Sequence, residues 1–235
     1  MINKFGNLSG NSSKYSLDHV SILEDSPIKN KTILFLGSSV TYGYASNGVS
    51  FADYITKRNG NKMIKETISG TTLVDDEENS YIARMKKIEK NTHVDLFICQ
   101  LSTNDQTKKK KLGKVADSKN MDAFDTHTIV GAIEYIISYA RNTWNCKVMF
   151  YTSPKYNSEE YKEMVALLQM IKEKWDITVI DLYNNDNFNA ITEEDRELYM
   201  ADSIHPTKAG YLKWWTPQIE NEIYKSLIES SAVKL

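Results

Sequence analysis

The chain has 235 residues, of which 41% are hydrophobic and 26% are charged, and its formal net charge is −2. This length and composition exclude a disordered chain and leave room for one sizeable domain, whereas a second full domain would be cramped. A charge so close to zero gives no reason to expect a nucleic acid or an anionic membrane as a partner.

Signals for membranes, export and metals are weak in this sequence. No apolar run approaches the roughly 18 residues that span a bilayer, and the first residues lack the apolar core of a signal peptide. The two cysteines, Cys99 and Cys146, lie inside apolar runs, and the four histidines are scattered. We therefore expect a cytoplasmic protein with no membrane insertion, no disulfide framework and no metal site.

The first 31 residues are expected to form an N-terminal extension that packs on a single domain covering residues 32–235. Within this extension, residues 15–24 alternate in part between apolar and polar side chains. The pattern fits either an added edge strand or a segment that wraps the domain, and the sequence leaves both open.

The rest of the chain alternates short apolar runs with segments of helical period. Strands are predicted at Thr32–Leu36, Lys62–Ile68, Val94–Leu101, Lys147–Tyr151 and Ile177–Leu182. Helices are predicted from Ser50 to about Asn59, around Tyr81–Ile88, after a cap at Asp125, over Tyr161–Trp175, and from Pro206 at the first helical position. The polar stretch Gln106–Phe124 is predicted to be a long loop, which is usually functional or mobile.

Alternating strands and helices predict a doubly wound α/β fold, a flavodoxin-like three-layer α/β/α sandwich around a parallel sheet. If the five strands take the order 2-1-3-4-5, the segments after three neighbouring strands carry Ser39, Gly70 and Asn104 at one edge of the sheet. A hydroxyl nucleophile with N–H donors around it is what acyl transfer requires. On the residues of this turn alone, a plain strand-to-helix turn with a capping serine is the favoured interpretation.

A base for the serine is available near the end of the chain. Asp202 precedes His205 by three residues in a turn closed by Pro206, so its carboxylate can accept a bond from one ring nitrogen. The other ring nitrogen could then activate a serine hydroxyl, which is a weak nucleophile without a base. Spacing alone does not show that His205 reaches Ser39.

Four short blocks, GSSVTYG, SGTTL, STND and DSIHPTKAGY, occur in this order between Gly37 and Tyr211. Together they resemble the signature blocks of the SGNH/GDSL hydrolase superfamily. The resemblance implies hydrolysis of esters or thioesters without a cofactor, often on lipids or O-acetylated carbohydrates. It also implies the site roles, which are Ser39 as nucleophile, His205 as base with Asp202 as its partner, and Ser39, Gly70 and Asn104 as oxyanion-hole donors.

Two positions depart from the family pattern. Ser38 stands where aspartate is common, which leaves two adjacent serines as candidates for the nucleophile. Ser102 stands where glycine is common, and its added side chain could shift the turn that carries Asn104. Asp105 is expected to brace that turn rather than to react.

The predicted function is a serine esterase that removes a short acyl group, such as acetyl, from a carbohydrate or similar polar substrate. A lysophospholipase or thioesterase for longer chains is a second possibility, and a non-catalytic binding domain is a third. The polar Gln106–Phe124 stretch favours small polar substrates, and Tyr42 and Tyr44 could line a sugar-binding wall. Of the adjacent Trp214 and Trp215, one is expected to pack and the other to face solvent or the pocket rim.

Overall fold

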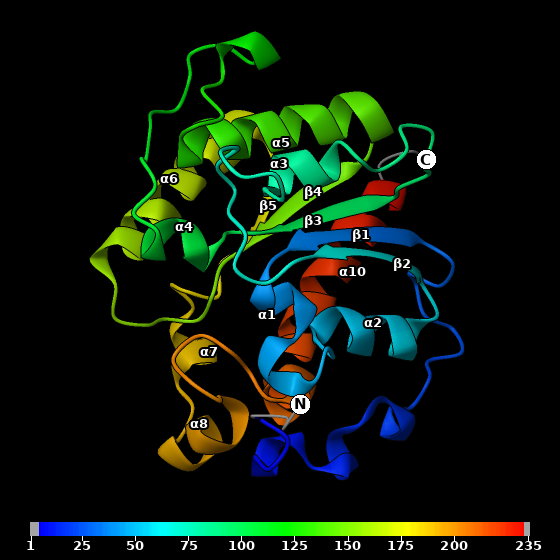
Figure 1. The fold of residues 1–235 in the computed structure, drawn as a ribbon. Helices are drawn as coiled ribbons and strands as arrows, with labels where there is room; N and C mark the ends of the chain where they lie inside the picture. Colours follow the sequence, from blue (N-terminus) through cyan, green and yellow to red (C-terminus); the bar gives the residue numbers. More distant parts are fainter. Residues whose placement is uncertain (1–4, 233–235) are drawn as a thin grey trace.

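The computed structural model describes residues 5–232, with side chains up to residue 228. Its centre is one parallel sheet of five strands in the order β2-β1-β3-β4-β5, which confirms the predicted topology (Figure 1). The strands are β1 (Thr32–Gly37), β2 (Lys62–Thr67), β3 (Leu96–Gln100), β4 (Lys147–Tyr151) and β5 (Thr178–Ile180). Residues of β1 and β3 are fully buried because helices cover both faces of the sheet.

Each face of the sheet has its own apolar core. One core packs α3 (Tyr81–Met85), α5 (Ile129–Trp144) and α6 (Glu159–Trp175) against the sheet. The other core packs α2 (Phe51–Asn59) and α10 (Thr216–Ala232) against the opposite face. This arrangement is the predicted three-layer sandwich. Within the described residues, no helix is both long enough and apolar enough to cross a membrane.

Shorter helices follow the strands or precede the last long helix. They are α1 (Ser39–Tyr42), α4 (Thr103–Thr107), α7 (Asp186–Asn189), α8 (Glu193–Tyr199), α9 (Lys208–Gly210), a π-helical turn at Tyr211–Trp215, and 3₁₀ turns at Ser9–Asn11, Ser13–Tyr15, Leu17–His19, Tyr44–Ser46 and Met121–Ala123. Several of them lie at the carboxyl edge of the sheet, where the predicted site residues also lie (Figure 1).

Three local predictions are wrong. The helix after the insert is capped by Thr128 and not by Asp125, because the Thr128 hydroxyl accepts the N–H of Gly131 at 3.2 Å. The final helical region begins at Lys208 after a Thr207 cap, because Pro206 is held in a bridge with Met200.

The third wrong prediction concerns the two adjacent tryptophans, both of which are buried. Trp215 lies in the core. Trp214 stacks on Phe188 of α7 with ring centroids 4.5 Å apart, and its Nε1 donates to the Phe188 carbonyl at 2.8 Å. The segment around α7 therefore covers the side chain that was expected to face solvent.

The described part of the N-terminal segment forms 3₁₀ turns and no strand, so the edge-strand alternative is wrong. Its side chains and carbonyls contact the body of the protein. The Tyr54 hydroxyl donates to the Tyr15 carbonyl at 2.6 Å, and the Asn11 side chain donates to the Ala45 carbonyl at 2.7 Å. Asn11 and Tyr15 of this segment therefore pack against the body of the protein.

The insert between α4 and α5 is anchored by a buried carboxylate, Glu134 of α5. Glu134 accepts the N–H of Ala116 at 2.8 Å and the indole N–H of Trp175 at 2.9 Å, and it forms an ion pair with Lys174. The Lys174 ammonium also donates to the carbonyls of Ala116 and Ser118. A charged group that would be costly to bury alone is thus satisfied while it holds the loop in place.

We expect Lys174→Met to lower the free energy of unfolding by about 3 kcal/mol, because removing one partner leaves the buried Glu134 charge uncompensated. Lys172→Met is the matched control, because Lys172 is exposed and its ion pair is with exposed Glu173 at 3.7 Å. The control should change stability by less than about 0.5 kcal/mol. Urea denaturation measures both, and equal losses in the two variants would contradict this account of the insert.

Candidate active site

Ser39 is the first residue of α1 and follows the sharp turn at the end of β1. Gly37 lies so close to Thr41 that an added Cβ would lie 1.7 Å from the Thr41 hydroxyl oxygen. Only glycine therefore allows the chain to turn this tightly after the strand. Ser39 is 7% exposed, so only a small part of it is accessible to solvent.

The turn is fixed from the neighbouring strand by Gln100, the buried last residue of β3. The Gln100 side-chain oxygen accepts the backbone N–H of Ser38 at 2.9 Å and the hydroxyl of Thr41 at 2.8 Å. The Thr41 hydroxyl in turn lies 2.6 Å from the hydroxyl of Tyr151 on β4. Residues on the adjacent strands β3 and β4 thus determine the conformation of the turn that carries Ser39.

A buried arginine connects this turn to the segment after β2. Arg84 of α3 is 2% exposed, and its guanidinium donates to the Gly37 carbonyl at 2.9 Å and the Glu66 carbonyl at 2.8 Å. It also donates to the hydroxyl of Thr71 at 3.1 Å. Because the guanidinium is planar and presents its donors in a rigid fork, it sets the separation of the chain before Ser39 from the chain after Gly70.

His205 contacts both Ser39 and Asp202. Its Nε2 lies 2.9 Å from the Ser39 hydroxyl, across 166 positions of sequence. Its Nδ1 lies 2.8 Å from one carboxylate oxygen of Asp202 and 3.0 Å from the other. Of the two adjacent serines, Ser39 is the one that meets the imidazole, whereas the Ser38 hydroxyl faces Gln100 at 3.4 Å.

The loop that carries His205 is closed on itself and supported from the N-terminal segment. The N–H of Ala201 donates to the His205 carbonyl at 2.9 Å, beside the bridge of Met200 to Pro206. The N–H of Lys208 donates to the side-chain oxygen of Asn11 at 2.9 Å. A segment near the start of the chain therefore helps to hold the loop that presents the imidazole.

Gly70 and Asn104 lie after the neighbouring strands β2 and β3. Gly70 has φ of +82°, a left-handed conformation that disfavours other residues. The Asn104 amide donates to the carbonyl of Thr71, next to Gly70, at 2.9 Å. The Ser102 hydroxyl accepts the Asn104 N–H at 3.1 Å and donates to the same Thr71 carbonyl at 3.3 Å. The serine that departs from the family pattern thus supports the Asn104 turn.

Asp105 braces the turn, as expected. Its two carboxylate oxygens accept the backbone N–H groups of Leu73 at 2.8 Å and Val74 at 3.1 Å. Burial raises the pKa of the Asp105 carboxyl group to about 6, although these N–H donors act in the opposite direction. The segment that contains Gly70 is therefore fixed to the segment that contains Asn104.

Sequence reasoning did not single out Arg84 or Gln100. A signal exists for each, because Arg84 interrupts the apolar face of Tyr81–Met85 and Gln100 ends an otherwise apolar strand. A polar residue within a buried apolar pattern needs a hydrogen-bonding partner. In both cases the partners are backbone atoms and hydroxyls beside the candidate site.

A serine hydroxyl, an imidazole and a carboxylate in hydrogen-bonded sequence at the carboxyl edge of a parallel sheet place the protein among the serine hydrolases. The sequence matches the GDSL-like lipase/acylhydrolase family over residues 35–213, and the chain belongs to this family. It is accordingly a serine ester hydrolase. Among curated proteins, none matches the chain.

Solved structures share the fold at low sequence identity. A protein from Lactobacillus plantarum is 16% identical with a TM-score of 0.68, over 85% of this chain and 98% of that one. A protein from Bacteroides ovatus named as a GDSL-like lipase is 19% identical with a TM-score of 0.58, over 83% and 98%. An acetyl xylan esterase is 14% identical with a TM-score of 0.58, over 82% and 99%. These likenesses establish the fold.

The Asp202 carboxylate is held in its charged form by its neighbours. Partial burial alone would raise the pKa of this group, but the His205 ring and the backbone N–H groups of Ile204 and His205 lower the pKa to about 2. Those two N–H groups donate to one carboxylate oxygen at 2.8 and 2.7 Å. A folded-state pKa below the ordinary value means that ionised Asp202 stabilises the folded protein.

This stabilisation should be fully present above the unfolded-state pKa of about 4 and should be lost as the pH falls towards 2. The difference in free energy of unfolding between wild type and Asp202→Asn is therefore expected to be largest above about pH 4 and to shrink at lower pH. Urea denaturation at several pH values measures it. The exposed Asp122→Asn control should show a small difference at every pH. If the difference in free energy of unfolding between wild type and Asp202→Asn grew on acidification, the lowered pKa of Asp202 in the folded protein would be contradicted.

Proposed function

We propose that the protein is a serine esterase that removes a short acyl group, such as acetyl, from a carbohydrate or a similar polar substrate. Ser39 is the nucleophile, His205 the general base, and Asp202 the group that orients the imidazole. The single observation that carries the proposal is the 2.9 Å contact between the Ser39 hydroxyl and Nε2 of His205. This distance lies within the reach that proton transfer requires.

The reaction proceeds in two steps. His205 takes the Ser39 proton as the hydroxyl oxygen attacks the ester carbonyl, and the oxyanion is stabilised by the N–H groups of Ser39 and Gly70 and by the Asn104 amide. The alcohol leaves with the proton carried by His205. Water, activated by the same imidazole, then hydrolyses the acyl-enzyme and releases the acid.

Two features support a polar substrate. Tyr44 is 46% exposed, and its ring centroid lies 5.3 Å from that of His205, so an exposed aromatic face adjoins the site. Such a face can pack against the apolar C–H side of a sugar ring while its hydroxyl stays in water. The cavity beside Asp202 is lined mostly by polar and charged residues, which suits a polar substrate. The fold shared with an acetyl xylan esterase agrees with this class of substrate.

We expect Ser39→Ala to abolish turnover of phenyl acetate and labelling by a serine-directed fluorophosphonate, since both need the hydroxyl. Asn104→Ala should retain a measurable remnant, about 10²–10³-fold below wild type, because one oxyanion donor is lost. Ser38→Ala should still be labelled, because the Ser38 hydroxyl faces Gln100. Mass spectrometry of the labelled peptide and initial rates test whether Ser39 is the nucleophile. An active Ser39→Ala variant would contradict this role.

Acyl-chain length separates a short-chain esterase from a lysophospholipase or thioesterase. With para-nitrophenyl acetate, butyrate and octanoate, kcat/KM is expected to fall at least about tenfold from acetate to octanoate, because a polar site gains nothing from added methylenes. Ser39→Ala measured on each ester removes the contribution of background hydrolysis. A kcat/KM that rises with chain length would favour the long-chain alternative instead.

A further inference from the structure

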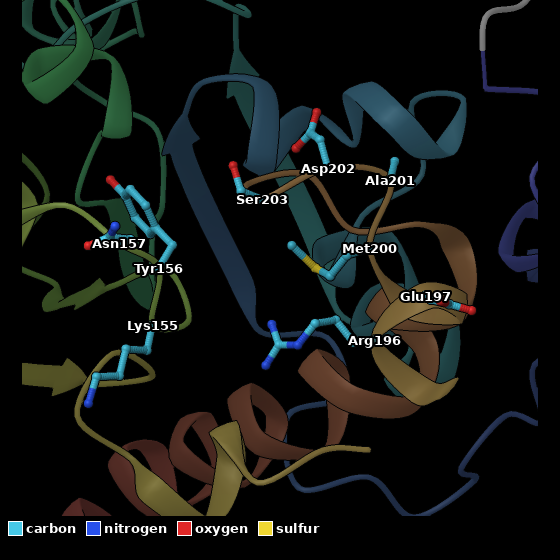
Figure 2. Close-up of a pocket in the computed structure, with 9 residues that line it drawn as sticks. All are labelled: Lys155, Tyr156, Asn157, Arg196, Glu197, Met200, Ala201, Asp202 and Ser203. Atoms are coloured by element: carbon cyan, nitrogen blue, oxygen red, sulfur yellow. The ribbon is translucent and has the colours of Figure 1, made fainter. Parts of the chain in front are cut away.

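A cavity of about 410 Å³ adjoins the segment that carries Asp202. One wall is formed by residues 155–157, which follow β4, and the other by residues 196–203, which include the end of α8 (Figure 2). Both walls lie at the carboxyl edge of the sheet, the edge that carries Ser39. The cavity thus opens beside the candidate catalytic residues and shares Asp202 with them.

Arg196 stands out among the arginines of the chain. Arg84 donates to four carbonyl or hydroxyl oxygens, Arg58 pairs with Glu220 at 3.3 Å, and Arg141 donates to the Asp176 carbonyl. For the guanidinium of Arg196, by contrast, no acceptor lies within hydrogen-bond distance among the residues that the structure describes. A partly buried guanidinium without an acceptor is a ready partner for an anion.

Among the charged side chains that line the cavity, Arg196 is the one whose cationic group faces the interior. Figure 2 shows the Arg196 guanidinium pointing into the space between the two walls, whereas the side chains of Glu197 and Lys155 point away from it. The Asp202 carboxylate is engaged by His205 and by two backbone N–H groups. Arg196 therefore brings a positive charge to the interior of the cavity, whereas the ionised Asp202 carboxylate lies in its wall.

The position of the cavity relates it to one side of the scissile bond. In an acyl transfer at Ser39, His205 must deliver its proton to the departing alcohol, so the alcohol part of the substrate lies next to the imidazole. Asp202 and Ser203, in the loop that carries His205, form part of the cavity wall. An alcohol part larger than the reacting oxygen would extend from His205 towards this space.

We propose that this cavity is a leaving-group subsite that selects esters whose alcohol part carries a carboxylate, and that Arg196 binds this carboxylate. The inference rests on the proposed esterase function and adds its substrate class. A planar guanidinium matches a carboxylate with two parallel N–H donors, which gives orientation as well as affinity. The alcohol part would then be an acidic saccharide or another hydroxylated carboxylic acid.

The test uses acetate esters that differ only in the charge and reach of the leaving group. The acids are para-acetoxybenzoate, para-acetoxyphenylacetate and para-acetoxyphenylpropanoate, each paired with its neutral methyl ester, with phenyl acetate as the common reference. For at least one acid, Arg196→Gln is expected to lower kcat/KM about tenfold or more, because one charged hydrogen-bond pair is lost. Its methyl ester and phenyl acetate should change less than about twofold, and Arg196→Lys should retain part of the preference.

Arg141→Gln is the matched control, since it makes the same substitution at an arginine on α5 outside the cavity. Arg141→Gln should leave kcat/KM unchanged for every acid and for its methyl ester. The subsite proposal would be overturned if Arg196→Gln lowered kcat/KM equally for the acids and their methyl esters. It would also be overturned if Arg196→Gln lowered kcat/KM for none of the acids. Phenyl acetate distinguishes the two levels of the proposal. If wild type cleaves it and Ser39→Ala does not, the esterase stands and only the subsite fails, whereas an inert wild type removes both.

Discussion

The hydrogen bond between Ser39 and His205 is the constraint on which the rest of the molecule depends. It joins side chains separated by 166 positions at 2.9 Å, so it exists only if the front and the end of the chain reach the same edge of the sheet. The strand order places β1 inside the sheet, and the segment before α10 returns to the carboxyl edge. A parallel sheet with crossovers on both faces meets this requirement, because all of its strands end on one side.

A contact of this length also needs both partners to be held rigidly, and the residues that hold them lie mostly outside the four signature blocks. Gln100 and Arg84 fix the turn before Ser39 with buried hydrogen bonds from β3 and α3. On the opposite side, Asn11 supports the chain just after His205. Buried polar networks of this kind are costly when incomplete, so each member restricts the positions available to the others.

The sequence predicted the parts of the fold that depend on local pattern. Apolar runs located the strands, and their alternation with helices indicated a parallel sheet. The four signature blocks identified Ser39 as the candidate nucleophile and His205 as the candidate base. What it missed depends on where individual side chains lie in the folded chain. Asp125 and Thr128 both suit a cap, and only the reach of the Thr128 hydroxyl to Gly131 decides between them. Trp214 is buried by a stack on Phe188 that no local pattern contains.

The residues proposed to react and the residues proposed to select the substrate lie in different parts of this chain. Ser39, Gly70 and Asn104, which are expected to act as nucleophile and oxyanion donors, lie in turns after β1, β2 and β3, where hydrogen bonds leave little freedom. The cavity beside Asp202 is instead built mostly from the loop after β4 and from residues 196–201, which lie between the signature blocks. Such segments can change in sequence without disturbing the sheet. Proteins that share this fold at 14–19% identity can therefore differ in the ligands they bind. In this chain the group proposed to select the alcohol is Arg196, whose guanidinium has no acceptor within hydrogen-bond distance among the described residues and which lies six residues before Asp202.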